Sequence, residues 1–333
     1  MTPSLGRIAV LGGGSWATAL AKLLLGNEER ILWYMRRADR IQEFLKYGHN
    51  PVYLSDVTFD TDRISFSDDI NRVISEADTL VLAVPSPYLL SHLEKVDADL
   101  RNKNIVSAVK GIVPEQNVTV TDYFLQHFGC EDVRMLAIGG PCHAEEVALE
   151  RLSYLTIACH DRERALLFAR SIGGKKLKTI ISTDVEGLEY AAVLKNVYAI
   201  AGGIVHGMKT GDNFMAMLAC NAAREMRRFI DAIAPCPRDI CHSAYLGDLL
   251  VTAYSRFSRN HNFGSMIGKG YSVKAAMMEM EMVAEGYYAT KCIHEINEAG
   301  PHTEMPILDC MFRILYEGVN PHKAIRAITG TFC

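Results

Sequence analysis

The pattern of apolar and polar positions divides the chain into two parts with different periodicity. In the first part, short apolar runs of strand-forming residues alternate with stretches of helix-forming composition. This alternation is typical of a buried parallel sheet that is covered by helices. The pattern predicts strands at residues 8–11, 30–35, 79–85, 105–109, 134–139, 153–159 and 179–182.

From about Asp184 onward, long amphipathic stretches replace the alternation, and strand character is low. Apolar residues that recur at helical spacing indicate helices that bury one face. The pattern predicts helices at residues 189–205, 213–234, 273–279, 284–299 and 306–316. We therefore predict an α/β domain with a mostly parallel sheet over residues 1–184 and an all-α domain over residues 185–333.

A glycine-rich turn follows the first predicted strand. The sequence GGGSWA occupies residues 12–17, and helix-forming residues come directly after it. This order matches the dinucleotide-binding motif G-x-G-x-x-A, in which Gly12 permits the tight turn and Gly14 lets the backbone approach a pyrophosphate. The N-terminus of the helix would then hold the phosphates. The motif predicts a Rossmann-like first domain that binds a nicotinamide cofactor, and an ordinary glycine turn is the alternative.

Two basic residues, Arg36 and Arg37, end the second predicted strand. Many NAD-binding folds carry an acidic residue there, which binds the ribose 2′-hydroxyl. A guanidinium group suits a 2′-phosphate instead, so the sequence favours NADPH over NADH. A solvated basic turn is the alternative interpretation.

A lysine interrupts the longest apolar helix. The predicted helix 189–205 is mainly apolar, and Lys195 lies in its middle. Burying an unpaired ammonium group is costly, so Lys195 must gain a counter-charge or lose its proton. A lysine in that environment is suited to proton transfer. The alternative is an aliphatic stem that packs in the core while the ammonium group reaches water.

Two further groups of residues carry candidate chemistry. Asp248 lies among apolar neighbours and could be the partner of a buried lysine; a helix cap before residues 249–254 is the alternative. Ser258, Arg259 and Asn260 place a hydroxyl, a guanidinium and an amide side by side. All three suit phosphate oxygens, although a polar turn would have the same composition.

Composition limits the classes of partner. The chain has 333 residues, 49% of them hydrophobic, and a net charge of −4, which argues against nucleic acid or an anionic membrane as a main partner. We expect no leader sequence and no membrane span, because no apolar run approaches the ~20 residues that a span requires. The nine cysteines lack the spacing of a metal site, so we predict reduced cysteines, no metal and a cytoplasmic protein.

Several motifs along the chain together resemble one family. They are GGGSWATALA at 12–21, HNPVYL at 49–54, AVPS at 83–86, VKGI at 109–112, GPCHAEE at 140–146, LKNVYAIAGGIVHG at 194–207, GDLLVT at 247–252, SRNHNFG at 258–264 and VAEG at 283–286. In this order and spacing, the set is similar to the bacterial-type NAD(P)-dependent sn-glycerol-3-phosphate dehydrogenases over most of the chain.

The resemblance implies reversible hydride transfer between NAD(P)H and dihydroxyacetone phosphate, which gives sn-glycerol 3-phosphate for phospholipid synthesis, by a homodimer. It implies that Lys195 is the proton donor and acceptor, with Lys110 and Asp248 as further catalytic residues. The substrate-binding residues that it implies are Lys110, Gly140, Cys142, Lys195, Asp248, Ser258, Arg259 and Asn260. With the motif glycines and the basic pair, the cofactor-binding residues are Gly12, Gly14, Ser15, Trp16, Arg36, Arg37, Lys110, Ala144, Arg259, Val283 and Glu285.

The sequence departs from the family's pattern at Cys142 and His143, where Ser or Thr and then Phe are usual. Cys142 keeps a small side chain but is a weaker hydrogen-bond donor. Two other functions fit the same plan: a reductase of a keto or hydroxy acid, and a nucleotide-sensing protein. The phosphate-suited residues 258–260 count against the first, and the presence of Lys195, Lys110 and Asp248 counts against the second.

Overall fold

The computed structural model describes residues 5–255, 257–280, 282 and 284–332. The chain forms two compact units. The first unit comprises Met1–Val109 and Val120–Leu188, and the second comprises Lys110–Thr119 and Glu189–Cys333.

The first unit is built on a sheet that has eight strands in the described part of the chain. The strands are β1 (Ile8–Leu11), β2 (Ile31–Tyr34), β3 (Ile64–Ser67), β4 (Thr79–Leu82), β5 (Asn104–Ser107), β6 (Met135–Gly139), β7 (Ser153–Ala158) and β8 (Leu177–Ser182). Their order is β3-β2-β1-β4-β5-β6-β7-β8, and neighbours are parallel except β6 and β7. The prediction of a mostly parallel sheet is confirmed.

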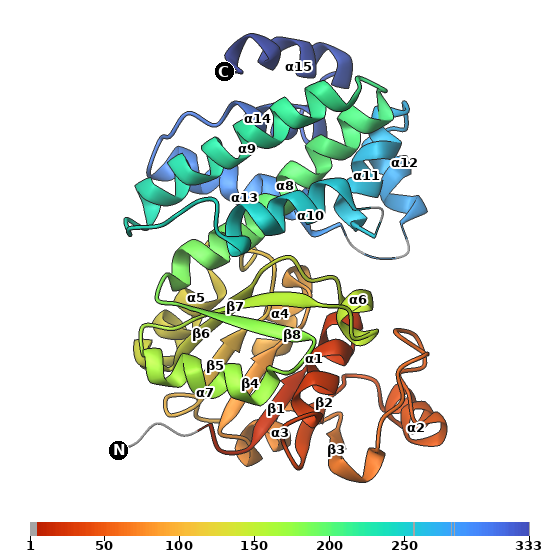
Figure 1. The fold of residues 1–333 in the computed structure, drawn as a ribbon, viewed down its shortest axis with the longest axis vertical. Coiled ribbons are helices and arrows are strands. Elements are labelled where there is room, and N and C mark those ends of the chain that lie inside the picture. The colour runs from red at the N-terminus through yellow and green to blue at the C-terminus, as the bar shows by residue number, and fades with distance from the viewer. Residues whose placement is uncertain (1–4, 256, 281, 283, 333) are drawn as a thin grey trace. The chain divides into compact units, whose positions relative to one another are not determined.

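The strand order reverses direction beside β1, which creates the crevice where open α/β sheets bind ligands. Helices cover both faces of the sheet (Figure 1). The helices of this unit are α1 (Ser15–Leu25), α2 (Ala38–Tyr47), α3 (Ile70–Glu76), α4 (Ser86–Leu93), α5 (Val120–Phe128), α6 (Ala144–Ala148) and α7 (Arg162–Ile172). Helix α1 packs against α6 and α7, and it begins directly after the glycine turn.

Burial explains which strands could be predicted. Every residue of β1, β2, β4 and β5 is buried, and β1, β2 and most of β4 are continuous apolar runs in the sequence, whereas β5 has Asn104 and Ser107 at its ends. Strand β3 escaped prediction because it lies at the edge of the sheet and alternates apolar residues with Ser65 and Ser67. An edge strand with one solvated face lacks the long apolar signal.

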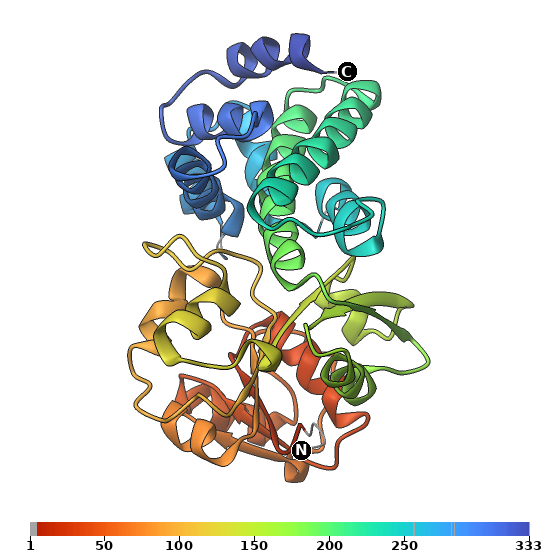
Figure 2. The ribbon, with the colours of Figure 1, turned by 90° about the vertical axis from the view of Figure 1, so that its left-hand side faces the viewer.

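The second unit is helical in its described residues (Figure 2). Its helices are α8 (Val185–Gly207, whose first turn lies in the first unit), α9 (Asp212–Ile233), α10 (Asp248–Tyr254), α11 (Arg259–Gly268), α12 (Val273–Glu279), α13 (Glu285–Ala299), α14 (Pro306–Leu315) and α15 (Pro321–Ile328). A π-helical turn, Ser243–Gly247, precedes α10. The sequence did not predict α11 or α15. In α11, two glycines and two asparagines lower helix propensity, and packing overrides that preference.

Helices α8 and α11 approach each other backbone to backbone. A Cβ atom on Gly203 would lie 2.0 Å from the carbonyl oxygen of His261, and one on Gly264 would lie 2.1 Å from that of Ile200. Neither position can therefore carry a side chain without separating the helices. This contact fixes the N-terminus of α11 relative to the middle of α8.

Helix α8 corrects the expectation that no segment is long and apolar enough to span a membrane. It has 23 residues and an 18-residue window of mean hydropathy 1.2. The apolar run in the sequence is broken by Lys195 and Asn196, but the helix continues through both. All of the window is buried inside the protein, as expected for a helix that is apolar on every side and lies at the centre of a folded domain.

The division into units differs from the predicted boundary at 184/185. The chain leaves the first unit after Leu188, and the excursion Lys110–Thr119 belongs with the helices. Two side-chain hydrogen bonds explain that grouping. Asn196 donates to the carbonyl oxygen of Lys110 at 2.9 Å, and Asn117 donates to Glu295 at 2.9 Å. A break in apolar periodicity could not reveal contacts of this kind.

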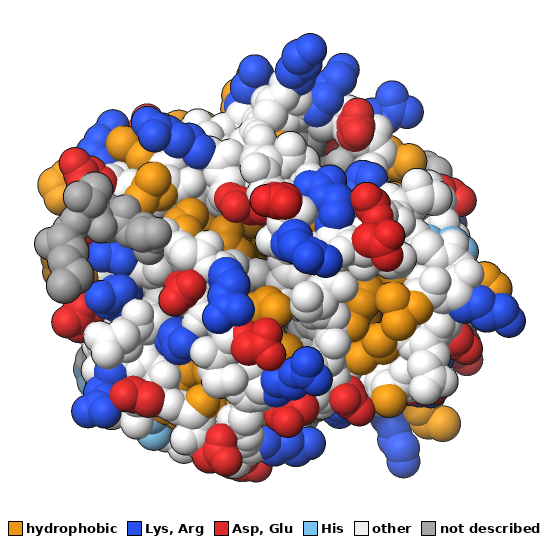
Figure 3. All heavy atoms as spheres, turned by 90° about the horizontal axis from the view of Figure 1, so that it is seen from below, with side chains coloured by type: hydrophobic (Ala, Val, Ile, Leu, Met, Phe, Trp, Pro, Cys, Tyr) orange, Lys and Arg blue, Asp and Glu red, His pale blue; other side chains and the backbone are white. Residues whose placement is uncertain are grey.

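Charges of both signs are interspersed on the face that Figure 3 shows, with small hydrophobic areas between them. Lys and Arg side chains do not gather there into one continuous basic patch. That face offers no electrostatic footprint of the kind that a nucleic-acid backbone requires.

Candidate functional site

The glycine turn after β1 is held by hydrogen bonds from its neighbours. Gly12 has a φ angle of +129°, and a Cβ atom there would lie 2.6 Å from the carbonyl oxygen of Ala83. The indole of Trp33 donates to the Gly12 carbonyl at 2.7 Å, and the amide of Asn50 donates to the Gly13 carbonyl at 3.1 Å. Only glycine fits the first position, so the turn is preformed.

The turn leaves an open space in front of helix α1. A Cβ atom on Gly14 would meet nothing within 4 Å, and the N-terminus of α1 has no side-chain cap. The residue before this N-terminus, Gly14, lines a cavity of about 310 Å³ together with Gly12, Arg36 and Arg37. An uncapped helix N-terminus beside a backbone that a ligand can approach fits the pyrophosphate of a dinucleotide. Ser15 and the half-buried Trp16 form the first turn of α1.

The two predicted phosphate-binding arginines differ in their surroundings. Arg37 forms an ion pair with Asp39, in which Nε donates to Oδ1 at 3.0 Å and Nη2 donates to the other oxygen. This pair raises the pKa of Arg37 and lowers that of Asp39. Arg36 lines the same cavity, and no ion pair of Arg36 occurs among the described residues. Of the two, Arg36 has the guanidinium that is available to a ligand.

Three predicted residues of the first unit follow strand β6. Gly140 has a φ angle of +127°, and Cys142 is buried. The Cys142 thiol donates to the carbonyl oxygen of Tyr154 at 3.2 Å, so this hydrogen bond ties the thiol to the neighbouring strand. Ala144 begins the short helix α6. The predicted substrate and cofactor contacts of these residues stay predictions.

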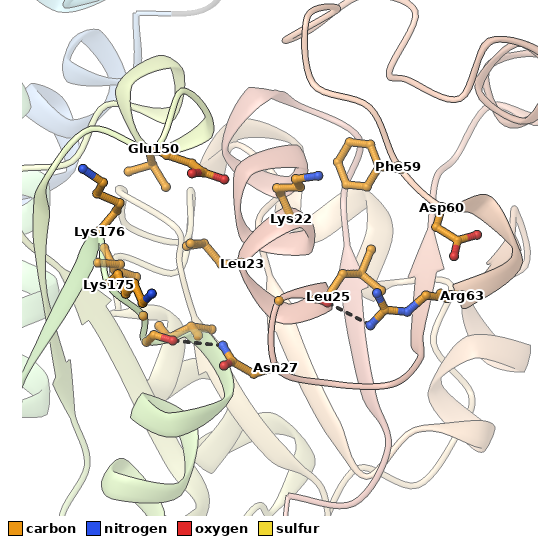
Figure 4. A pocket seen from close by; sticks show the side chains of 16 residues that line it. Lys22, Leu23, Leu25, Asn27, Phe59, Asp60, Arg63, Glu150, Lys175 and Lys176 are labelled. Atoms are coloured by element: carbon orange, nitrogen blue, oxygen red, sulfur yellow. Dashed lines mark hydrogen bonds between the residues drawn. The ribbon is translucent and has the colours of Figure 1, made fainter.

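A second cavity of the first unit, about 380 Å³, lies at the other end of α1 (Figure 4). Two of its polar side chains, Arg63 and Asn27, make hydrogen bonds to the backbone. Arg63 donates to the carbonyl oxygens of Leu25 and Glu28, and Asn27 donates to that of Gly173. The bonds to Leu25 and Gly173 satisfy carbonyl groups at the C-terminal ends of α1 and α7. None of the predicted site residues lines this cavity.

One group of possible metal-ligating side chains occurs among the described residues. Asp132, His160 and Glu186 bring one ligand atom each within 4.8 Å of one another near the protein surface. His160 Nδ1 lies 2.7 Å from Asp132, and its Nε2 lies 3.6 Å from Glu186. The His160 ring therefore lies between two carboxylates.

In the second unit, Lys195 pairs with Asp248. Their exposed fractions are 2% and 1%, and the Lys195 ammonium contacts the Asp248 carboxylate. Lys195 lies on α8, and Asp248 is the first residue of α10. The N-cap position of α10 is occupied by Gly247, not by Asp248. A counter-charge offsets part of the cost of burying each ion.

Further cations converge on Glu285, at the start of α13. Burial raises the pKa of the Glu285 carboxyl, and the nearby charges of Arg259, Lys110 and Lys195 oppose that shift. Its Oε2 atom is buried and has no hydrogen-bond partner in the described structure. One carboxylate thus lies within electrostatic reach of three predicted site residues from three different segments. Val283, also predicted to bind the cofactor, lies outside the described residues.

The predicted phosphate-binding residues form the N-terminus of α11 rather than a turn. The Ser258 hydroxyl caps the helix by accepting the N–H of His261 at 3.2 Å. Arg259 is the first helical residue and is partly exposed. Asn260 is buried, and its amide donates to the side-chain oxygen of Asn196 at 2.9 Å. A guanidinium at a helix N-terminus is well suited to an anion.

The sequence did not single out Asn50 and Asn196, whose side chains make hydrogen bonds within the two candidate sites. Both lie inside quoted motifs, but an asparagine in a loop or a helix carries no distinctive pattern. Asn50 bonds to the glycine turn of the first unit, and Asn196 bonds to Lys110 and Asn260 in the second. A buried amide next to an expected catalytic lysine was the available signal.

Comparison with known proteins gives one consistent family. Residues 7–165 match the NAD-dependent glycerol-3-phosphate dehydrogenase N-terminus, and residues 184–326 match the corresponding C-terminus. A glycerol-3-phosphate dehydrogenase [NAD(P)+] of Exiguobacterium sp. is 31% identical over 96% of this chain and 94% of its own length. One from Ectopseudomonas mendocina is 34% identical over 93% of this chain and 90% of its own length.

The solved structures agree with the sequences. The crystal structure of a glycerol-3-phosphate dehydrogenase from Coxiella burnetii superposes with a TM-score of 0.88, at 27% identity, and covers 98% of this chain and 99% of that one. The match therefore extends through both units. The chain belongs to the NAD(P)-dependent glycerol-3-phosphate dehydrogenase family.

Proposed function

We propose that this NAD(P)-dependent oxidoreductase catalyses reversible hydride transfer between NAD(P)H and dihydroxyacetone phosphate, with Lys195 as the proton donor and acceptor. The observation that carries the assignment of Lys195 is its buried pairing with Asp248. A buried ammonium group that is held by a carboxylate is oriented and kept away from bulk water. Such a group is the chemical requirement for delivering a proton to a ketone oxygen.

Each charged residue of the second unit would have its own role in the reaction. Reduction of a ketone places negative charge on its oxygen, and the Lys195 ammonium would stabilise that charge and donate a proton. In the reverse direction, neutral Lys195 would accept the proton of the alcohol. Asp248 would orient Lys195, and Lys110 would add positive field. Arg259, at the N-terminus of α11, would bind the substrate phosphate and so supply orientation remote from the reacting carbon.

The first unit would hold the cofactor at the glycine turn and the N-terminus of α1. When bound, the nicotinamide supplies or takes up the hydride. Arg36 supports a preference for NADPH, because it lines the cavity and has no ion-pair partner in the part of the chain that the structure describes. The predicted Ser15, Trp16 and Ala144 contacts belong to the same proposal.

The setting of the reaction is also proposed. The resemblance of the motifs supports a cytoplasmic homodimer that makes sn-glycerol 3-phosphate for phospholipid synthesis. Small-molecule substrates are consistent with a chain whose net charge is −4 and which lacks a strong electrostatic bias. Size-exclusion chromatography with light scattering tests the oligomer, and a mass equal to one chain at micromolar concentration would contradict it.

The Lys195→Met variant tests the catalytic assignment. We expect turnover with dihydroxyacetone phosphate to fall by ~10²–10⁴-fold, as for loss of a positioned general acid or base. Binding of NADPH, measured by fluorescence titration, should be retained because the glycine turn lies in the first unit. The double variant Lys195→Met with Asp248→Asn controls for the buried charge that the single substitution leaves. Turnover close to wild type in a variant that binds NADPH would remove Lys195 from this role.

A further inference from the structure

A chain of buried hydrogen bonds connects the segments of the second unit that carry its charged site residues. Asn196 donates from Nδ2 to the backbone carbonyl oxygen of Lys110 at 2.9 Å. Asn260 donates from Nδ2 to Oδ1 of Asn196 at 2.9 Å, and the backbone N–H of Gly286 donates to Oδ1 of Asn260 at 2.9 Å. We call these three bonds the amide relay.

Each link of the amide relay lies at or next to a charged residue of the candidate site. Lys110 is itself a link, and Asn196, Asn260 and Gly286 directly follow Lys195, Arg259 and Glu285 in the sequence. The four residues that these three bonds join come from the 110–119 excursion, α8, α11 and α13. The relay thus joins the backbones that carry the four charges.

The relay is buried, and its geometry permits one arrangement of its amides. The exposed fractions of Asn196 and Asn260 are 5% and 8%. Each asparagine donates through nitrogen and accepts through oxygen, so turning either amide over would oppose two donors or two acceptors. A buried group left without its partner costs more than an ordinary hydrogen bond contributes. The relay therefore sets a defined orientation.

At Gly286, the backbones of α8 and α13 are too close for a residue with a side chain. A Cβ atom on Gly286 would lie 2.4 Å from the carbonyl oxygen of Asn196. The first turn of α13 consequently sits directly against α8. The short contact keeps Gly286 within reach of Asn260, and it keeps the neighbouring Glu285 within the field of Lys195 and Lys110.

We propose that Asn196 is a positioning residue, which holds Lys110 in register with Lys195 through the Lys110 carbonyl group. The chain leaves the first unit directly after Val109, and Lys110 is the first residue of the excursion that belongs to the second unit. The Asn196 bond ties the start of the 110–119 excursion to the helix that carries Lys195. This inference rests on the proposed function, in which Lys110 supplies positive field to the substrate.

A double-mutant cycle tests the proposal. We expect Asn196→Ala to lower kcat/KM for dihydroxyacetone phosphate by ~10–100-fold, mainly through kcat, since a misplaced catalytic group loses most of its effect. In a Lys110→Ala background, the same substitution should lower kcat/KM by less than ~3-fold, because residues that act as one unit are not additive. Asn221→Ala, which removes an amide that bonds to the Met217 carbonyl on α9, is the matched control and should have little effect.

The outcomes separate the inference from the proposed function. Wild-type kcat/KM in Lys110→Ala would overturn the role of Lys110 itself. An impaired Lys110→Ala enzyme in which Asn196→Ala costs the same factor as in wild type would overturn the proposal that Asn196 acts by positioning Lys110. If Asn196→Ala does not fold, as judged by circular dichroism and NADPH binding, Asn196→Ser takes its place in the cycle, with the same expectations.

Discussion

The paired charges of Lys195 and Asp248 make each residue dependent on the other. Both side chains are almost fully buried, so a substitution at one leaves an uncompensated ion at the other. Breaking a buried pair from one side typically costs ~3–5 kcal/mol, whereas replacing both ions can be nearly neutral. Removing both ions should therefore restore stability, but it cannot restore a catalytic role of the ammonium group.

We predict that Lys195→Met and Asp248→Asn each lower the free energy of unfolding by ~3–5 kcal/mol, while the double variant recovers most of that loss. Catalysis should not recover, because the double variant still lacks the ammonium group. Urea denaturation of the four proteins measures the stabilities, and NADPH oxidation measures turnover. Additive losses of stability would indicate that the two ions do not interact energetically.

At the cofactor cavity, the ion pair of Arg37 with Asp39 predicts unequal roles for the two neighbouring arginines. Arg36→Ala should raise KM for NADPH by about 10-fold or more, because it removes a charge-assisted hydrogen bond that contributes ~1.5–3 kcal/mol. The KM for NADH should change little. Arg37→Ala should have a smaller effect, since its guanidinium already has a partner. Steady-state kinetics with both cofactors decides this, and equal effects of Arg36→Ala on NADPH and NADH would count against a 2′-phosphate contact.

Arg259 provides a test of the phosphate assignment. Arg259→Ala should lower kcat/KM for dihydroxyacetone phosphate far more than for unphosphorylated dihydroxyacetone, because a guanidinium at the N-terminus of α11 favours an anion. Asn260→Ala should reduce both activities, since its amide belongs to the relay. An unchanged ratio of the two substrates in Arg259→Ala would place the phosphate elsewhere.

At the scale of elements, the contact of α8 with α11 carries the geometry of the second unit. Gly203→Ala should lower the melting temperature, because its Cβ would meet backbone and force the helices apart, at a cost of ~1–3 kcal/mol. The adjacent Gly202→Ala is a matched control. Its Cβ would mainly meet the flexible end of Met215, and alanine has the better helix propensity. Equal melting temperatures of the two variants would show that the close approach is not limiting.

A second junction of helices depends on the buried carboxyl of Glu225 on α9. Its oxygens accept the N–H groups of Ile307 and Leu308 at 2.8 and 3.0 Å, at the start of α14. Burial raises the pKa of this carboxyl from 4.5 to about 8, against these two bonds and the nearby Tyr198 hydroxyl, which lower it. Between pH 4.5 and about 8, the folded protein therefore holds a proton at Glu225 that the unfolded chain has released.

The sign of the resulting pH dependence follows directly. Between pH 4.5 and about 8 the folded state holds more protons at Glu225 than the unfolded state, so the free energy of unfolding falls as pH rises. Glu225→Gln should make that decline shallower, although the variant is less stable overall because one N–H loses its acceptor. Urea denaturation at several pH values measures both slopes, and parallel slopes would contradict the shifted carboxyl.

At the scale of the whole molecule, the sequence was most informative where burial is continuous. The central strands and long apolar helices were predictable because every position contributes to one apolar run. The family motifs also located Lys195 and Asp248, whose pairing the fold confirms. Strand β3, helix α11 and the grouping of residues 110–119 were not predictable, since each depends on contacts between distant segments. Local periodicity carries no record of such contacts.

The excursion of residues 110–119 has a consequence for exchanging parts between relatives. The chain passes from one unit to the other after Val109, Thr119 and Leu188, so no single breakpoint separates the two units. A chimera that is joined once near residue 184 would take Lys110 from one parent and Asn196 from the other. Recombination that preserves activity should therefore take residues 110–119 and the C-terminal half from the same parent.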